Sequence, residues 1–343
     1  MKRFGMMSFA LALLGADNTA NGAPDWPADV QEVRIPGTAD GKEQPALFWR
    51  APGREKAPLL VGLHTWSSDY KQAGSSLPYL QWCRQEGWHF IHPNFGGPNR
   101  TPQAMGSDQA VAEVVRAVAW AKQSAEVDEQ RVYLIGVSGG GHMAMQMAGR
   151  HPEIWAGVSA WCGISDIAQW HADCTAEPKF GRYAGNIEAA LGGPPDSESR
   201  RQDAARRSPL TWLENARTVP LDIQAGVHDG RSGSVPFVHS LRAFNAVAAE
   251  GERIPQEEIE RFYATHQPPG PELETEPIYG KWQPLYRRQS GNARVTIFEG
   301  GHEIVHGVAR NGLAGQRRGA PAVWDIPQPK PLEVKDDAAQ SGK

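Results

Sequence analysis

Short apolar runs recur along the chain, and segments with a helical spacing of apolar residues lie between most of them. Residues 57–64 and 131–138 are mainly apolar, which is typical of strands buried on both faces of a sheet. Residues 107–125 show the clearest helical pattern, with Ser107 or Asp108 as the cap. Further strands are predicted at residues 30–35, 45–50, 88–95, 155–163, 221–227 and 293–300.

This alternation predicts an α/β fold with a mostly parallel central sheet and helices on both faces. One domain would span residues 24–319, followed by a proline-rich tail at 320–343 that wraps the surface or is disordered. Residues 163–220 and 252–291 are much longer than ordinary connections of ~2–6 residues. We therefore expect two excursions above the sheet.

The N-terminus carries Lys2 and Arg3, then an apolar run and small residues, which is the layout of a secretory signal peptide. We expect a signal at residues 1–22 and a secreted or periplasmic protein, the alternative being an N-terminal helix. In an exported protein Cys162 and Cys174 are close enough in sequence to form a disulfide, while Cys83 is expected to be a buried thiol.

The net charge of the chain and its distribution limit the classes of binding partner that are expected. The net charge is −4, without a long block of one sign, so no nucleic acid and no anionic membrane is expected as a partner. No apolar run reaches the ~18 residues of a membrane-spanning helix. The oligomeric state is left open.

The motif with the clearest chemistry is Gly136-Val137-Ser138-Gly139-Gly140, a G-x-S-x-G sequence between a predicted strand and a predicted helix. Such a turn places the serine in strained backbone geometry, and only small neighbours let the chain pack that closely. The hydroxyl of Ser138 would project above the sheet, and the amide of Gly139 could hold a developing oxyanion. His142, one turn further, is expected to be a buried residue that supports the turn.

With this motif, and with "AGVHDGRSGSVP" and "EGGHEI", the chain resembles the α/β-hydrolase superfamily over roughly residues 30–315. It is most similar to the catalytic domain of the prolyl oligopeptidase family and to related secreted esterases. The resemblance implies a triad of Ser138, Asp229 and His302, in the chain order of this superfamily, with Asp166 as the alternative acid. It also implies the amide of Trp66 as the second oxyanion donor, with Thr65 as the alternative.

A competing interpretation is a zinc site, because His302-Glu303-Ile304-Val305-His306 fits H-E-x-x-H. That site needs both histidines on one helix face and a third ligand. Gly300 and Gly301 directly after a strand leave His302 on a loop. We therefore assign His302 to the triad and expect neither a metal nor a cofactor.

The sequence thus predicts a secreted serine hydrolase that cleaves a carboxylic ester, carried on a small molecule or a polysaccharide. Too few residues precede the predicted sheet for the propeller of prolyl oligopeptidases, and no acidic pair stands out that would bind a peptide amine. A peptidase of that family is the alternative, and a non-catalytic binding protein is the alternative from another class. Aromatic residues in the two long intervals could stack on a sugar or an aromatic acyl group, or could be ordinary packing: Trp170, Trp212, Tyr279, Trp282 and Tyr286.

Overall fold

A computed structural model describes residues 25–324 except 38–40 and 54, so the expected signal peptide and most of the tail lie outside the described residues. The strands are β1 (Gln31–Ile35), β2 (Gln44–Trp49), β3 (Ala57–Leu63), β4 (His89–Pro93), β5 (Val127–Val137), β6 (Gly157–Trp161), β7 (Leu221–Gly226), β8 (Pro284–Ser290) and β9 (Ala293–Phe298). The helices are α1 (Leu77–Glu86), α2 (Asp108–Ser124), α3 (Gly139–Arg150), α4 (Ile167–Ala176), α5 (Gly181–Leu191), α6 (Glu198–Arg206), α7 (Val238–Val247), α8 (Gln256–Thr265) and α9 (His306–Ala314).

All described strands form one sheet in the order β1-β2-β4-β3-β5-β6-β7-β9-β8. The run from β4 to β9 is parallel, and β1, β2 and β8 pair antiparallel at the two ends. The predicted mostly parallel sheet is confirmed. Since the carboxyl ends of parallel strands share one edge, the loops after β3, β5, β6, β7 and β9 are brought together there.

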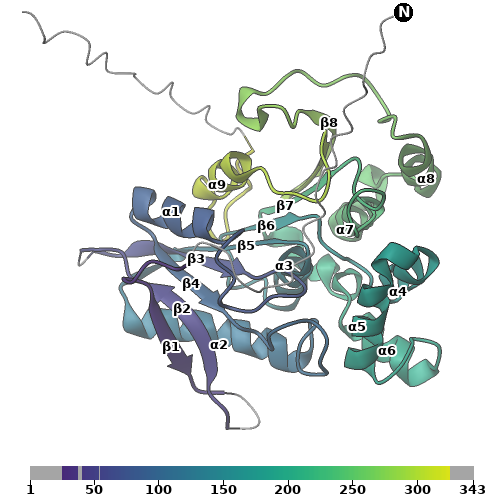
Figure 1. Cartoon of the computed structure of the whole chain (residues 1–343). Helices are drawn as coiled ribbons and strands as arrows, with labels where there is room; N and C mark the ends of the chain where they lie inside the picture. The colour runs from purple at the N-terminus through teal and green to yellow at the C-terminus, as the bar shows by residue number, and fades with distance from the viewer. Residues whose placement is uncertain (1–24, 38–40, 54, 325–343) are drawn as a thin grey trace, which may run out of the picture.

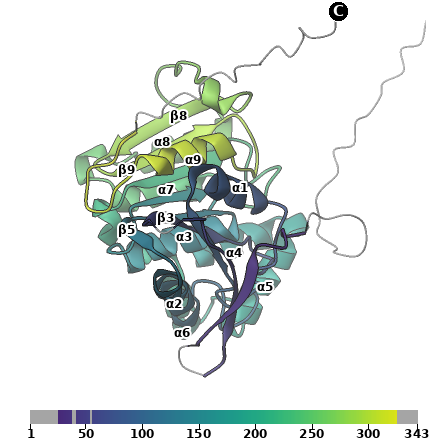
Figure 2. The same cartoon turned by 90° about the vertical axis from the view of Figure 1, so that its left-hand side faces the viewer.

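Helices cover both faces of this sheet, as predicted. Figures 1 and 2 show α1 and α9 on one face, and α2, α3 and α7 lie on the other. The apolar residues of the central strands are almost fully buried between these layers. In the described part of the chain, no helix combines the length and the apolar character that crossing a bilayer requires.

The first long interval forms the helices α4, α5 and α6, which gather beside the carboxyl edge of the sheet (Figure 1). They carry a small apolar core of their own, which includes Trp170 and Ile187. This core also contains Trp66 and Val235 from the loops after β3 and β7. The interval is therefore anchored to the same loops that were expected to form the site.

The second long interval differs from the prediction, because residues 252–291 are not simply an excursion. They contain α8, which packs against α7, and the edge strand β8, which pairs with β9. The charged residues Arg287 and Arg288 interrupt the apolar pattern of β8. An edge strand that is solvated on one face needs no continuous apolar run, so the pattern hid it.

The three cysteines are all buried and free, so Cys162 and Cys174 are not bridged. Cys162 follows β6 and its sulfur lies against the carbonyls of Gly301 and Glu303. Cys174 instead packs inside the small core of α4, α5 and α6. The two residues thus belong to different apolar clusters, Cys162 to the main core and Cys174 to the small one.

Candidate active site

Ser138 occupies the tight turn between β5 and α3. Its backbone has φ 60° and ψ −121°, and its amide donates to the carbonyl of Trp161 at 2.8 Å. A Cβ at Gly136 would lie 2.3 Å from the carbonyl carbon and oxygen of Gly140, and one at Gly140 would lie 2.7 Å from the Leu63 oxygen. The flanking glycines are therefore required by packing, and the strained serine is held at the helix N-terminus.

Asp229 and His302 meet beyond the ends of β7 and β9. His302 Nδ1 donates to Asp229 Oδ2 at 2.7 Å, and the carboxylate is fully buried while the imidazole is 24% exposed. Asp229 Oδ1 accepts from the amides of Gly230 at 2.9 Å and Val235 at 3.1 Å. Both carboxylate oxygens are thus occupied, which fixes the orientation of the ring and leaves Nε2 as the proton acceptor.

The electrostatics of this pair favour a charged imidazole. Burial by itself disfavours the imidazolium, but the neighbouring carboxylate of Asp229 outweighs it and raises the pKa of His302 well above its ordinary value. A raised pKa means that the Asp229 carboxylate stabilises the protonated ring of His302 relative to the neutral ring. This is the property that general-base catalysis by His302 would use.

Ser138 and His302 line the same cavity, of ≈ 500 Å³, at the carboxyl edge of the sheet. No hydrogen bond joins their side chains in the described structure. Catalytic hydrogen bonds are often long before substrate binds. The remaining lining comes from the loop after β3, the end of β5, α5, the histidine loop and the start of α9: Thr65, Trp66, Ser67, Ser68, Gln72, Ser75, Val137, Arg182, Tyr183, Glu303, Ile304 and His306.

Two backbone amides stand side by side at this cavity. A Cβ at Gly139 would lie 2.5 Å from both N and Cα of Trp66, and neither the Gly139 nor the Trp66 amide has an acceptor among the described residues. The amide of Thr65 is already bonded to Gln72 Oε1 at 2.8 Å, which removes it as a free donor. Asn99 donates to the Trp66 carbonyl through its amide (2.9 Å) and Nδ2 (3.3 Å), and so steadies the loop.

The alternative site residues have other roles in the structure. Asp166 is the N-cap of α4, and its carboxylate accepts from the amide of Gln169 at 3.0 Å. His306 is the first residue of α9 and packs edge-on against Tyr79 and Trp82, so His302 lies on the preceding loop. The two histidines do not share a helix face, and the H-E-x-x-H interpretation does not fit this geometry. His142 is buried, its Nε2 lies 2.8 Å from the Arg207 carbonyl oxygen, and burial lowers its pKa to about 4.

Of the two interpretations of the aromatic residues in the long intervals, the structure favours ordinary packing. Trp170, Tyr279 and Tyr286 are buried packing residues, and none of the five aromatic residues from the long intervals lines the Ser138 cavity. No lining residue comes from residues 252–291 either. Tyr183 and Arg182 reach the cavity instead, and Arg182 Nη2 donates to the Tyr183 hydroxyl at 2.8 Å. Their position depends on how α5 packs, which no local pattern reveals.

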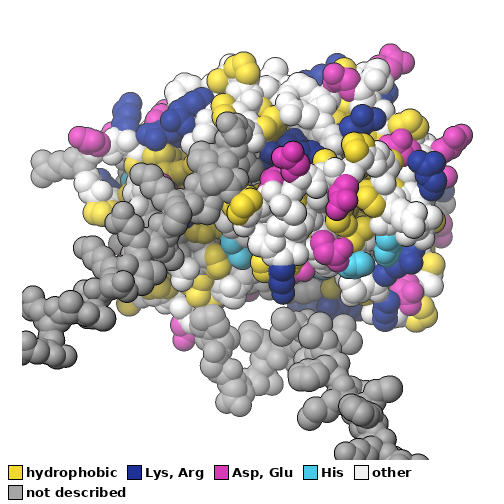
Figure 3. All heavy atoms as spheres, turned by 90° about the horizontal axis from the view of Figure 1, so that it is seen from above, with side chains coloured by type: hydrophobic (Ala, Val, Ile, Leu, Met, Phe, Trp, Pro, Cys, Tyr) yellow, Lys and Arg dark blue, Asp and Glu magenta, His cyan; other side chains and the backbone are white. Residues whose placement is uncertain are grey.

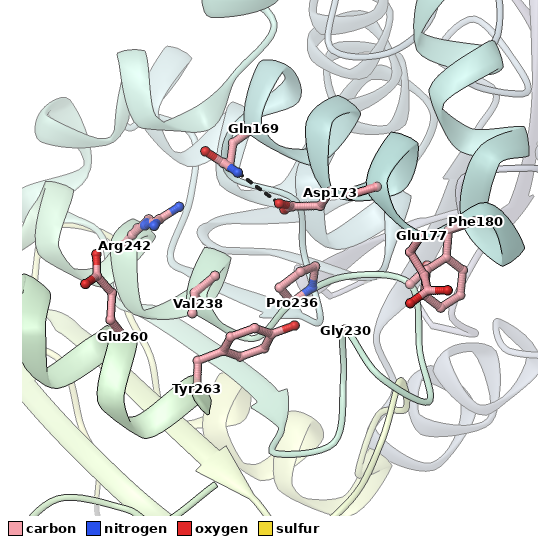
Figure 4. Close-up of a pocket in the computed structure, with 12 residues that line it drawn as sticks. Gln169, Asp173, Glu177, Phe180, Gly230, Pro236, Val238, Arg242, Glu260 and Tyr263 are labelled. Carbon is pink, nitrogen blue, oxygen red and sulfur yellow. Dashed lines mark hydrogen bonds between the residues drawn. The ribbon is translucent and has the colours of Figure 1, made fainter. Parts of the chain in front are cut away.

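A second cavity, of ≈ 470 Å³, lies on another side of the acid loop and contains no member of the Ser138, Asp229 and His302 set (Figure 4). Gly230 and Pro236 form one part of its lining, and α4 and α8 contribute Asp173 and Tyr263. On the molecular surface seen from above in Figure 3, acidic and basic side chains are interspersed.

The comparison with protein families identifies the family of this chain. Residues 80–259, more than half of the chain, match the prolyl oligopeptidase family. No curated relative matches the sequence.

Among solved structures, puromycin hydrolase is similar with a TM-score of 0.56 and 18% identity over 86% of this chain and 39% of that one. Acylaminoacyl peptidase from Pyrococcus horikoshii is similar with a TM-score of 0.51 and 18% identity, over 64% of this chain and 34% of that one. A Mycobacterium tuberculosis puromycin-hydrolyzing peptidase gives 0.51 and 18%, over 64% and 33%. The chain thus spans well under half the length of these proteins, and the likeness concerns the fold. By its family match, the chain belongs to the prolyl oligopeptidase family, which is a family of serine hydrolases.

Proposed function

We propose that this enzyme hydrolyses a carboxylic ester through an acyl-enzyme formed on Ser138. The observation that carries the proposal is the 2.7 Å contact of His302 with a buried Asp229, in the same cavity as a strained serine and two free amides. His302 Nε2 would take the Ser138 proton as the hydroxyl attacks the carbonyl, and would return it to the leaving alcohol. Water would then hydrolyse the acyl-enzyme by the same route.

The two amides account for the charge that develops in this reaction. When the serine adds to the carbonyl, the carbonyl oxygen becomes negative, and amide donors at Trp66 and Gly139 would stabilise it. Asp229 would hold the Nδ1–H tautomer and stabilise the imidazolium. These steps use only groups of this chain.

Neutral polar side chains favour an ester that carries hydroxyl groups, such as a carbohydrate ester. Ser67, Ser68 and Ser75 line the cavity, and their hydroxyls have no hydrogen-bond partner among the described residues. Each hydroxyl can both donate to and accept from a sugar hydroxyl. The ring of Tyr183 adds an aromatic surface of the kind that stacks on a sugar or an aromatic acyl group.

The test of catalysis is the Ser138→Ala variant together with a phosphonate probe that reacts with activated serines. Removal of the nucleophile should lower kcat by roughly 10⁴-fold or more and abolish labelling, while the unfolding temperature stays close to that of the wild type. Activity within tenfold of the wild type would refute the assignment. A wild-type protein that is neither labelled nor active would instead indicate the non-catalytic binding protein.

The second candidate function is a peptidase, which the names of the similar structures support. An amide expels a poorer leaving group than an ester and needs tighter positioning of the scissile bond. Acetylated sugars, aromatic esters and X-Pro peptide amides should therefore be compared by kcat/KM on one enzyme preparation. We expect turnover of the esters and none of the amides. Efficient peptide cleavage with negligible ester hydrolysis would establish the peptidase.

We further propose export, on the basis of the charged and apolar N-terminus described above. Expression of the full chain with fractionation of the host should yield a periplasmic or secreted protein shortened near residue 22. Mass spectrometry of the N-terminus measures the cleavage, and an intact chain confined to the cytoplasm would contradict the proposal.

A further inference from the structure

A buried thiol lies beside the Asp229–His302 pair. Cys162 follows β6 in a left-handed conformation with φ 47°, which is uncommon for a residue other than glycine. One ligand atom each from Cys162, Asp229 and His302 can be chosen so that all three lie within 4.8 Å of one another. The thiol lies 3.4 Å from the Glu303 carbonyl oxygen and 3.8 Å from that of Gly301, which keeps its sulfur next to the histidine loop.

Thiolate, carboxylate and imidazole are the three ligand types that zinc uses in proteins. With bonds of about 2.0–2.3 Å, the ligand atoms of a tetrahedral zinc site lie roughly 3–4 Å apart. The longest separation in the cluster therefore has to shorten by about 1–2 Å at most to close around an ion. A cysteine thiolate and the Asp229 carboxylate also supply two negative charges, so the buried Zn²⁺ would be neutralised.

The surroundings suit such a site. The amides of Gly230 and Val235 bond to Asp229 Oδ1 and orient the carboxylate, so that Oδ2, which faces His302 Nδ1, is the oxygen that a metal would take. His302 is partly exposed and lines the Ser138 cavity, which provides an entry path for the ion.

We propose that Cys162, Asp229 and His302 form an inhibitory Zn²⁺ site. On binding, the Cys162 thiol loses its proton to solvent, and the ion takes the place of the proton between His302 Nδ1 and Asp229 Oδ2. When the ring is neutral beforehand, the displaced Nδ1 proton moves to Nε2 and one proton is released per ion. When the ring starts as the imidazolium, the Nδ1 proton also leaves to solvent and two protons are released. In both cases the bound ring is neutral. Nε2 then has no lone pair for the Ser138 proton. The bound enzyme is inactive, although the metal never touches the serine.

The inhibitory effect of zinc rests on the proposed function, but metal binding does not. The first test measures binding alone and therefore distinguishes a failure of the zinc site from a failure of the proposed function. Co²⁺ replaces Zn²⁺ in such sites and gives a near-ultraviolet charge-transfer band when a thiolate is bound. Titration of the full chain with Co²⁺ should give this band at one ion per molecule. The band should disappear in Cys162→Ala and persist in Cys174→Ala, a matched control because Cys174 is also a buried, free thiol.

The second test measures how buffered Zn²⁺ inhibits ester hydrolysis. The measured quantity is the free Zn²⁺ concentration that halves the activity of each variant. Cys162→Ala should raise this concentration by roughly tenfold or more, since even second-shell changes weaken metal sites ~10–100-fold. Cys174→Ala should not change it, and EDTA should restore the inhibited wild type. If Cys162→Ala does not fold, Cys162→Ser keeps the size of the side chain and removes the soft ligand.

Several results would overturn the proposal. The absence of a thiolate band in the wild type would show that the cluster does not close around a metal. Equal zinc sensitivity of Cys162→Ala and the wild type would also do so. If His306→Gln alone relieved inhibition, zinc would bind in the Ser138 cavity through His306, and Cys162 would have no part in it.

Discussion

Gly139→Ala tests whether the amides of Gly139 and Trp66 form an oxyanion hole. The added Cβ would lie 2.5 Å from both N and Cα of Trp66. Carbon atoms in contact prefer separations of about 3.5–4.0 Å, so the loop after β3 must move away by roughly 1 Å. A donor at about 2.9 Å from the oxyanion would then lie well beyond hydrogen-bonding distance. The variant therefore removes one donor and leaves the triad side chains in place.

The loss of one oxyanion donor costs about 10²–10³-fold in kcat, and we expect a decrease of this size. KM should change little, because the bond forms only as charge develops in the transition state. The assay is steady-state hydrolysis of a p-nitrophenyl acetate series, with kcat and KM determined separately and thermal unfolding followed by circular dichroism.

Two glycines provide controls. Gly149, in the same helix α3, is equally crowded, because its Cβ would lie 2.6 Å from the Trp212 backbone, away from the cavity. Gly149→Ala should lower the unfolding temperature and keep kcat within about threefold, since no transition-state contact is lost. Gly185 in α5 has open space around it, and Gly185→Ala should stabilise slightly, by about 0.5–1 kcal/mol. A folded Gly139→Ala variant with kcat within threefold of the wild type would refute the oxyanion assignment.

Three further predictions concern the acid and the base. Asp229→Asn should lower kcat by roughly 10³–10⁴-fold because His302 can adopt the wrong tautomer. Asp166→Asn should leave activity near wild type, since asparagine caps a helix as well as aspartate does. The reverse result would move the acid to Asp166. The raised pKa of His302 predicts that kcat/KM increases with pH through a pKa above the ordinary histidine value, because only the neutral ring accepts a proton; a pH profile with an unshifted or lowered pKa would contradict this. Gly233→Ala would place a Cβ 2.2 Å from Asp229 Oδ1 and 2.5 Å from His302 Cβ. The added atom displaces the pair, so kcat should fall by at least ~10²-fold. Near-normal kinetics would show that the pair tolerates displacement.

The sequence alone was sufficient for the class of fold and for the strand-to-helix turn at Ser138. Both depend on local patterns: apolar runs for strands buried on two faces, and small residues where the backbone must turn sharply. The family resemblance then supplied Asp229 and His302, which the structure brings together at 2.7 Å. The positions of Asp229 and His302 in the sequence do not by themselves predict that the two side chains are in contact.

Tertiary structure decided what surrounds the turn. The edge strand β8 carries Arg287 and Arg288 and has no buried-strand signature, because one of its faces meets solvent. Tyr183 reaches the cavity only because α5 packs beside the carboxyl edge of the sheet. Cys162 lies against His302 because the ends of β6 and β9 share that edge, although 139 residues separate Cys162 from Gly301, the neighbour of His302. Contacts between such distant segments arise from packing of the whole sheet, and periodicity within one segment carries no information about them.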